Sequence, residues 1–323
     1  MKMPLILSIQ FMSEHEFLYE VESPFEFNSK PALAKWILEN RGHFISKLEK
    51  TGAILFSSTS VRDAKEFDQF VSMFNFRVFT YSDSLSNAVR IDKTEKVFTA
   101  NEAPQEIEIH LHHELAQTPV YPRYIFFLCT AASELGGETP VCRSDHLYSK
   151  ILEEDSRLLK KFEDFGVIYN LIMSNEDELE SGQGRSWQKT FGASTKAVAE
   201  KKLRGLGYTW KWVDQDELLV TTRVFQATKT LPGGNKSFFN QVLAASLGWK
   251  NRSYLGLPPV LFGNGDTINE QSIQLISTAA KSLTMLRQWS EGDILMIDNH
   301  RVMHGRKPFF GSKPREVLVS LTA

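Results

Sequence analysis

The chain has 323 residues, of which 42% are hydrophobic and 24% are charged, and its formal net charge is −2. This length allows a large buried core, while the near-neutral charge gives no general attraction to nucleic acid or to an anionic membrane surface. No apolar stretch approaches the roughly 20 residues that span a bilayer. We therefore expect a globular protein that acts on a small molecule, with neither nucleic acid nor membrane as a partner.

Two cysteines, Cys129 and Cys142, are too few for a disulfide framework or a cysteine-based zinc site, which favours a cytoplasmic location. The opening MKMPLILSIQFM lacks a following small-residue cleavage site, so we interpret it as a first β-strand and not as a signal peptide. The sequence has no repeat and no Pro/Gly/Ser-rich linker. Residues 1–323 are therefore expected to form a single domain.

The spacing of apolar residues predicts helices separated by short strands. Four segments have the periodicity of amphipathic helices, namely 29–50, 60–74, 144–165 and 269–289. Short β-type runs bounded by Gly, Pro, Asn and Asp are found at 52–58, 123–131, 217–227, 236–242, 293–299 and 316–323. The pattern favours a mixed α/β fold with a mainly antiparallel β-core, a barrel or double-sheet jelly roll, and flanking helices.

The stretch EIEIHLHHEL, residues 106–115, concentrates three histidines beside a glutamate. If it is a strand, alternation places His112 and Glu114 side by side on one face, while His113 points to the other. His110 shares the face of His112 but lies further back. A single histidine here is more often a structural residue than a ligand, so the pair needs support from elsewhere in the chain.

That support comes from GDILMIDNHRVMHG, where His304 follows a strand and a turn and Gly305 allows close backbone approach. Two imidazoles and one carboxylate on one side of a metal suit Fe(II) with open positions for other ligands. Arg315 follows eleven residues later. An H-x-E pair alone is weak evidence, whereas the three motifs together are much stronger.

These motifs make the chain resemble the TauD/TfdA superfamily, in particular its clavaminate-synthase-like branch and the SyrP-like group. The resemblance rests on TGAILF, LHHELAQTPVYP, SELGGETPVCRSDHLY, GRSWQKTF, SFFNQ and GDILMIDNHRVMHGRKPFFG, and it covers nearly the whole chain. It implies a double-stranded β-helix, the jelly roll of this branch. It further implies an Fe(II)- and 2-oxoglutarate-dependent oxygenase that couples O₂ and the decarboxylation of 2-oxoglutarate to hydroxylation of an unactivated C–H bond.

Residue by residue, the resemblance implies that His112, Glu114 and His304 bind iron. Arg315 matches the arginine that binds the distal carboxylate of 2-oxoglutarate, and Thr139 of GGET matches a threonine that assists it. Arginine suits this role because its planar fork binds a carboxylate through two hydrogen bonds and stays protonated. Fe(II), one carboxylate, 2-oxoglutarate and Arg315 together form a neutral set, which matters because an unpaired buried charge is costly.

Two features narrow the chemistry that the resemblance implies. Halogenating relatives lack the metal-binding carboxylate, so Glu114 argues against halogenation. Some relatives carry a second arginine four residues after the first, where this chain has Val319, so a substrate anchor at that position is absent. Desaturation and cyclisation stay open as alternatives to hydroxylation.

For the substrate we expect an amino acid or amino-acid derivative of natural-product or secondary metabolism, either free or presented by a carrier protein. An anionic group would need an arginine, and the candidates are Arg223, Arg185 and Arg90. Arg223 is the first choice because it lies in an expected strand that could point it inward. Asn240 and Gln241 could supply amide contacts.

Two other classes of protein were weighed. A zinc hydrolase could use two histidines and a glutamate, but the helical H-E-x-x-H spacing is absent and Arg315 and Thr139 would have no role. A binding protein without catalytic activity would be expected to lose a metal ligand or Arg315, and all are present.

Overall fold

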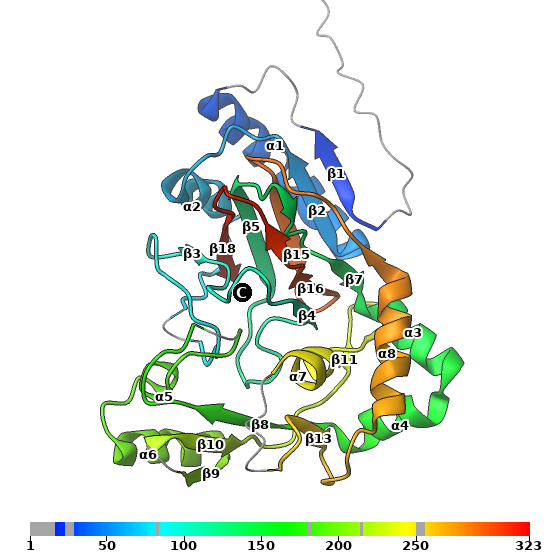
Figure 1. Ribbon diagram of the computed structural model, residues 1–323. Helices are drawn as coiled ribbons and strands as arrows, with labels where there is room; N and C mark the ends of the chain where they lie inside the picture. The colour runs from blue at the N-terminus through cyan, green and yellow to red at the C-terminus, as the bar shows by residue number, and fades with distance from the viewer. Residues whose placement is uncertain (1–16, 23–28, 82–83, 180–181, 214–215, 250–255) are drawn as a thin grey trace, which may run out of the picture.

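The computed structural model describes residues 17–22, 29–81, 84–179, 182–213, 216–249 and 256–323. It is a mixed α/β structure built around two β-sheets (Figure 1). In spatial order, the larger sheet contains β1 (Tyr19–Glu22), β2 (Ala53–Ser57), β15 (Ile294–Asp298), β5 (Tyr124–Ala131), β18 (Glu316–Thr322) and β3 (Val97–Thr99). The second sheet contains β14 (Thr284–Met285), β7 (Val141–Arg143), β16 (Val302–Arg306) and β4 (Ile109–His112).

The larger sheet is buried on both faces, and its strands show this directly. In β15, Ile294 and Met296 belong to one apolar cluster, whereas Leu295 and Ile297 belong to another. Because successive side chains of a strand point to opposite faces, two buried faces require a continuous apolar run, and ILMI provides it. The second of these clusters also contains Val141 of β7 and Val302 of β16, so it joins the two sheets.

Two helices cover the face of the larger sheet that carries Ile294 and Met296 (Figure 1). They are α1 (Lys30–Thr51), which ends at Gly52 in the left-handed conformation with φ 86°, and α2 (Ala64–Ser72). Asp63 caps α2 by accepting a hydrogen bond from the Glu66 amide at 2.9 Å. Their buried residues, among them Leu33, Ile37, Phe44, Phe67 and Phe70, form the first cluster with the sheet. The helices expected at 29–50 and 60–74 are thus confirmed, the second with a later start.

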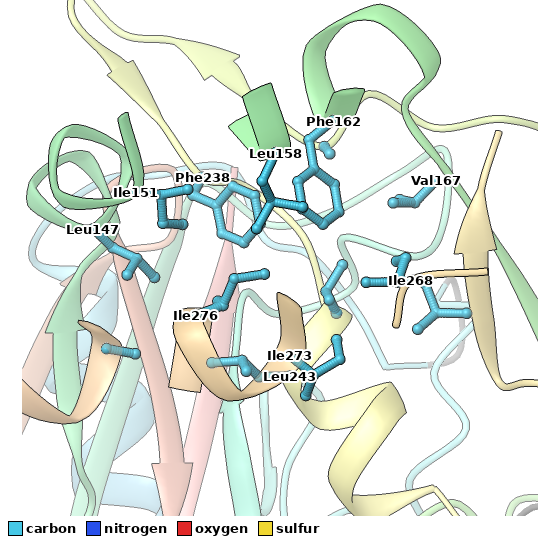
Figure 2. Close-up of a cluster of buried hydrophobic side chains, with 14 of the residues drawn as sticks. Leu147, Ile151, Leu158, Phe162, Val167, Phe238, Leu243, Ile268, Ile273 and Ile276 are labelled. Carbon is cyan, nitrogen blue, oxygen red and sulfur yellow. The ribbon is translucent and has the colours of Figure 1, made fainter. Parts of the chain in front are cut away.

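A second group of helices packs beside the smaller sheet. Figure 2 shows Leu147 and Ile151 of α3 (Ser144–Glu154) meeting Leu158 and Phe162 of α4 (Ser156–Phe165) and Ile276 of α8 (Glu270–Leu283). The expected single helix over 144–165 is broken at Asp155, whose carboxylate caps α4 through the Leu158 amide at 2.9 Å. The helix expected at 269–289 ends at Leu283, where β14 begins.

The remaining strands and helices lie mostly at the far end of the molecule from α1 (Figure 1). A further sheet has the order β13 (Val260–Phe262), β8 (Val167–Met173), β10 (Leu218–Thr221) and β9 (Thr209–Trp212), and it packs with α5 (Trp187–Phe191) and α6 (Lys196–Leu206). Two short pairs, β11 (Lys229–Thr230) with β12 (Lys236–Ser237) and β17 (Phe309–Phe310) with β6 (Leu135–Gly136), complete the strands. No helix within the described ranges is both long and apolar enough to cross a membrane.

The strand predictions had mixed outcomes. Those at 52–58, 123–131, 293–299 and 316–323 are confirmed as β2, β5, β15 and β18. The prediction for 236–242 was wrong beyond Ser237, where β12 ends, and α7 (Val242–Gly248) begins at Val242. The prediction for 217–227 was wrong beyond Thr221, where β10 ends. The strand expected at residues 1–12 lies outside the described residues.

Candidate active site

The site forms where β4 pairs with β16. His112, the last residue of β4, lies directly opposite His304 of β16, and their ring centroids are 4.4 Å apart. This close pairing depends on Gly305, because a Cβ there would lie 2.4 Å from the carbonyl oxygen of Ile109. Glu114 lies in the turn after β4, next to Leu115 with φ 59°, so it is not on the strand face that alternation predicted. The turn nevertheless returns its side chain to His112.

Three ligand atoms converge at this point. The carboxylate Oε2 of Glu114 lies 3.5 Å from His304 Nε2 and 3.9 Å from His112 Nε2, and one ligand atom from each residue lies within 4.8 Å of the others. These separations exceed the usual lengths of hydrogen bonds. Two imidazole nitrogens and one carboxylate oxygen that face one another in this way fit a divalent metal such as Fe(II).

The imidazole of His112 is held in the tautomer that metal binding requires. Its Nδ1 donates to the His110 carbonyl oxygen at 2.8 Å, which leaves the lone pair of Nε2 directed to the cluster. Burial and the neighbouring His304 lower the pKa of His112 to about 4. The ring is therefore neutral at pH 7, as a ligand must be.

Glu114 is held at both its backbone and its side chain. The side-chain amide of Asn299 accepts from the Glu114 amide at 2.8 Å and donates to the Glu114 carbonyl at 3.0 Å. The other carboxylate oxygen, Oε1, accepts from Arg90 Nη2 at 2.8 Å. Burial raises the pKa of the Glu114 carboxyl, but Arg90 and the two imidazoles lower it more, so its pKa lies far below the usual range. The group is an anion at all ordinary pH values.

His113 has a structural role, and its ring faces away from the cluster. It is fully buried, its Nδ1 bonds to the Asn299 carbonyl, and it packs on Phe239 with ring centroids 4.6 Å apart. Burial lowers the pKa of His113 to about 3. The prediction that His112 and Glu114 converge while His113 turns away agrees with this placement. The fixed orientation of Asn299, which holds both neighbours, was missed from the sequence, although Asn299 stands in the DNH motif itself.

One cavity, which we call the Arg315 cavity, opens beside the cluster between strands of both sheets. Its wall includes Phe127, Thr139, His304, Arg306, Arg315 and Val317, together with four residues shared with a second cavity. Arg315 Nε donates to the Gly137 carbonyl at 3.0 Å, and its terminal nitrogens make no hydrogen bond to any described residue. Burial lowers the pKa of Arg315 to about 10, which leaves it protonated at neutral pH. A half-buried cation whose two terminal nitrogens have no partner in the described chain could bind a carboxylate.

Two neighbours of Arg315 shape this cavity. Gly137 has φ 75°, and a Cβ there would lie 2.8 Å from Arg315 Nε, so the glycine allows the guanidinium its place. The hydroxyl of Thr139 accepts a hydrogen bond from Trp289 Nε1 at 3.0 Å, which leaves its own proton available to a ligand. Arg306 also lies in the wall, where it donates to the carbonyls of Asn101, Ala103, Pro104 and Ile107.

The second cavity, the Trp249 cavity, is lined by His112 and Glu114 of the cluster. Its wall includes Asn87, Glu114, Gln117, Gln241, Ala244 and Trp249. Arg90, Asn101, Ile109 and His112 line both cavities. The buried polar atoms of this wall without a hydrogen-bond partner among the described residues include Asn87 Oδ1, Gln117 Oε1, Trp249 Nε1 and two guanidinium nitrogens of Arg90. Unpaired buried polar atoms are costly, and such atoms in a cavity indicate a polar ligand.

The substrate residues expected from the sequence fall into two groups. Arg90 and Gln241 line the Trp249 cavity, and Gln241 Nε2 also donates to the His113 carbonyl at 3.0 Å. Asn240 is absent from the cavity wall, because its side chain donates to Ala227 and accepts from Val242. Asn240 is therefore a structural residue.

Two arginines expected at the substrate also lie elsewhere. Arg185 is buried, stacks 4.2 Å above the Tyr81 ring and donates to the carbonyls of Ser84 and Ser86. Arg223 is exposed and lies past the end of β10, over the Phe225 ring. The assumption that the strand continued to Arg223 was wrong, and with it the reason for placing this side chain in the site.

Comparison with known proteins agrees with this geometry. The family model "Taurine catabolism dioxygenase TauD, TfdA family" matches residues 29–322. A clavaminate synthase-like protein of Arabidopsis thaliana is 31% identical, over 91% of this chain and 88% of its own. The dapdiamide synthesis protein DdaC of Enterobacter agglomerans is 30% identical, over 85% and 83% of the two chains.

Among solved structures, one of similar fold is PvcB, described as an Fe, alpha-ketoglutarate dependent oxygenase from an isonitrile synthetic pathway. It superposes with a TM-score of 0.52 at 12% identity, over 95% of this chain and 87% of that one. At this identity the likeness concerns the fold alone. The match of the family model over nearly the whole chain is decisive: the chain belongs to the TauD/TfdA family of dioxygenases, which use Fe(II), 2-oxoglutarate and O₂.

Proposed function

We propose that this dioxygenase hydroxylates an unactivated C–H bond of an amino acid or amino-acid derivative, either free or presented by a carrier protein, in natural-product or secondary metabolism. The observation that carries the proposal is the pair of cavities that meet at His112 and Arg90. One cavity contains the cation for a dicarboxylate cosubstrate. The other brings a polar ligand to the same ligand cluster.

In this proposal His112, Glu114 and His304 bind iron. Arg315 and Thr139 bind the distal carboxylate of 2-oxoglutarate. When bound, iron, 2-oxoglutarate and O₂ together supply the oxidant that removes hydrogen from the substrate carbon. The proposal includes the double-stranded β-helix expected from the sequence, which the six-stranded and the four-stranded sheet would form together.

The walls of the Trp249 cavity support a polar substrate. Asn87 Oδ1 and Gln117 Oε1 are buried acceptors without a partner in the described chain, and an ammonium group would satisfy them. The relative DdaC is described as a dapdiamide synthesis protein, which is consistent with natural-product metabolism. Both cysteines are buried and unpaired, as suits a reducing cytoplasm, where we place the enzyme.

Desaturation and cyclisation use the same cofactors and diverge after hydrogen abstraction, so product analysis decides between them. The zinc hydrolase and the non-catalytic binding protein weighed from the sequence do not fit a TauD/TfdA dioxygenase with its three ligands in place.

The test is a screen of amino acids with the Fe(II)- and 2-oxoglutarate-loaded enzyme in air. We expect at least one compound to stimulate succinate release well above the rate without substrate, and its product to gain one oxygen by mass spectrometry. A product that has lost two hydrogens would replace hydroxylation by desaturation or ring closure. Stimulation by no amino acid, free or as a pantetheine thioester, would reject the amino-acid substrate.

A further inference from the structure

Arg90 is a buried cation shared by the two cavities. Its side chain is 7% exposed, and Nη2 binds Glu114 at 2.8 Å. The other two nitrogens, Nε and Nη1, are buried and have no partner among the described residues. The guanidinium rests 5.2 Å from the centre of the Phe98 ring, which compensates only part of this loss. Arg90 therefore has donors that a ligand could use.

The segment that carries Arg90 is fixed on both sides. The Val89 carbonyl accepts from the Glu102 amide at 3.1 Å, and the Ile91 amide donates to the Thr99 hydroxyl at 2.9 Å. Arg185, expected from the sequence at the substrate, instead holds the preceding residues through the carbonyls of Ser84 and Ser86. A guanidinium on a segment held in this way is preorganised for binding.

The charges around the iron site are unequal when Arg90 is counted. Fe(II), Arg90 and Arg315 bring four positive charges, whereas Glu114 and 2-oxoglutarate bring three negative ones. Arg306 is left out of this sum, because its two terminal nitrogens donate to backbone carbonyls and its charge interacts with the carboxylates of Glu102 and Glu106. The neutral set inferred from the sequence omitted Arg90. The set that includes Arg90 has one positive charge in excess, and one further anionic group beside Arg90 would balance it.

The Trp249 cavity offers no other arginine or lysine for this charge among its described lining residues. Glu108, the other acid in its wall, already binds Lys307. The position four residues after Arg315 is Val319, which is buried in the core and provides no cation. An anionic substrate group would therefore meet Arg90.

We propose that Arg90 binds a carboxylate of the substrate with the donors that Glu114 leaves free, so that the substrate is an acid and not a neutral amide or ester at this point. The inference rests on the proposed function. The carboxylate has two possible sources, which are the α-carboxylate of a free amino acid and the side-chain carboxylate of an acidic residue whose α-carboxyl is joined to a carrier.

The experiment compares acids with neutral analogues on the Fe(II)-loaded enzyme at saturating 2-oxoglutarate. The panel contains free amino acids, their carboxamides, and pantetheine thioesters of aspartate, glutamate, asparagine and glutamine. For the stimulating compound we expect loss of its carboxylate to raise the KM by at least about 30-fold, the lower end for a desolvated charge pair. Stimulation by free acids identifies the α-carboxylate, and stimulation by aspartyl or glutamyl thioesters alone identifies the side chain.

A binding measurement separates recognition from turnover. Calorimetry of the same compounds with the Mn(II)- and 2-oxoglutarate-loaded protein should show the same preference for the acid. In Arg90→Gln the ratio of acid to carboxamide affinity should fall towards one, whereas Arg90→Lys should keep part of it. Arg223→Gln is the control, since it removes an exposed arginine that lines neither cavity and should keep the ratio.

The outcomes are distinguishable. Equal use of acids and carboxamides by the unaltered enzyme overturns the assignment of Arg90 and leaves the proposed function standing. An unchanged ratio in Arg90→Gln that still binds Mn(II) overturns it as well. Stimulation by no member of the panel rejects the amino-acid substrate itself, and the assignment falls with it. The acid and amide comparison uses the unaltered enzyme, so it does not depend on the variants folding.

Discussion

The two cavities that meet at His112 are built from different kinds of structure. The Arg315 cavity is walled mostly by strands, with Phe127 from β5, His304 from β16 and Val317 from β18. The Trp249 cavity is walled mostly by connecting segments and by α7. Strands paired on both sides hold their side chains rigidly, whereas loops vary without disturbing the core. The comparison teaches that the wall of the Arg315 cavity depends mainly on the sheets, whereas the wall of the Trp249 cavity depends mainly on the segments between them.

The largest expected effect comes from Glu114, which lines the Trp249 cavity and faces His112 and His304. Glu114→Ala should abolish substrate-coupled turnover and weaken Mn(II) binding by more than about a hundredfold, because it removes the only anionic ligand. Metal titration and succinate release measure this. His113→Ala is the control: it should lower thermal stability, since a buried ring is lost, but retain metal binding. A metal site that depends on His113 and not on Glu114 would contradict the assignment.

Substitution of Arg315 should affect ligand binding in the Arg315 cavity and leave the metal ligands largely unaffected. We expect Arg315→Gln to weaken 2-oxoglutarate binding by roughly 30-fold to several thousand-fold, because a shielded charge pair contributes about 2–5 kcal/mol. Mn(II) affinity should change little, and Arg315→Lys should recover part of the loss because it keeps the charge but not the fork. Titration of 2-oxoglutarate under anaerobic conditions gives the comparison. An unchanged affinity would remove Arg315 from the cosubstrate site.

A substitution at Trp249 tests the Trp249 cavity, where we expect the substrate to bind, independently of 2-oxoglutarate. Its indole N–H is buried without a partner in the described chain and lies in the cavity wall. Trp249→Phe should raise the substrate KM by roughly three- to tenfold, the size of one net hydrogen bond, and leave the 2-oxoglutarate requirement unaltered. If both requirements rise together, the two cavities are not separable in the way that their walls indicate.

The smallest effect is expected at Arg223. Because this side chain is exposed beyond β10, Arg223→Ala should change the KM for substrate, the KM for 2-oxoglutarate and thermal stability only slightly, within about 0.5 kcal/mol for the last. Steady-state kinetics and a thermal melt are sufficient. A tenfold rise in substrate KM would restore Arg223 to the substrate site and place the binding region elsewhere than the Trp249 cavity.

The candidate metal cluster was predicted from the sequence because three motifs, of which the H-x-E pair alone is weak evidence, support one another. The alternation of EIEIHLHHEL predicted that His112 and Glu114 would converge and that His113 would turn away. The structure has this outcome, although β4 ends at His112 and a turn, not the strand, positions Glu114. The confirmed strands and helices likewise follow from apolar periodicity, which depends only on neighbours along the chain.

The residues that bind the substrate could not be predicted from the sequence in this way. Whether an arginine binds a ligand depends on what its donors already contact, and those contacts come from distant parts of the chain. Arg185 and Arg90 look alike in sequence, yet one is used by the carbonyls of Ser84 and Ser86 while the other meets Glu114 with donors to spare. Arg223 was misplaced because alternation holds only while a strand continues, and β10 ends at Thr221.

The sequence by itself determined most of the core elements, since apolar periodicity depends on short spacing, and its resemblance to the TauD/TfdA superfamily supplied the candidate ligand set and the candidate cosubstrate arginine. Only the tertiary structure decided which buried charges face one another. Asn299 and Arg90 reach Glu114 from 185 and 24 residues away, respectively. Their contacts form only when the sheets have packed, because hydrogen bonds and ion pairs act over a few ångströms of space and not over positions in a chain.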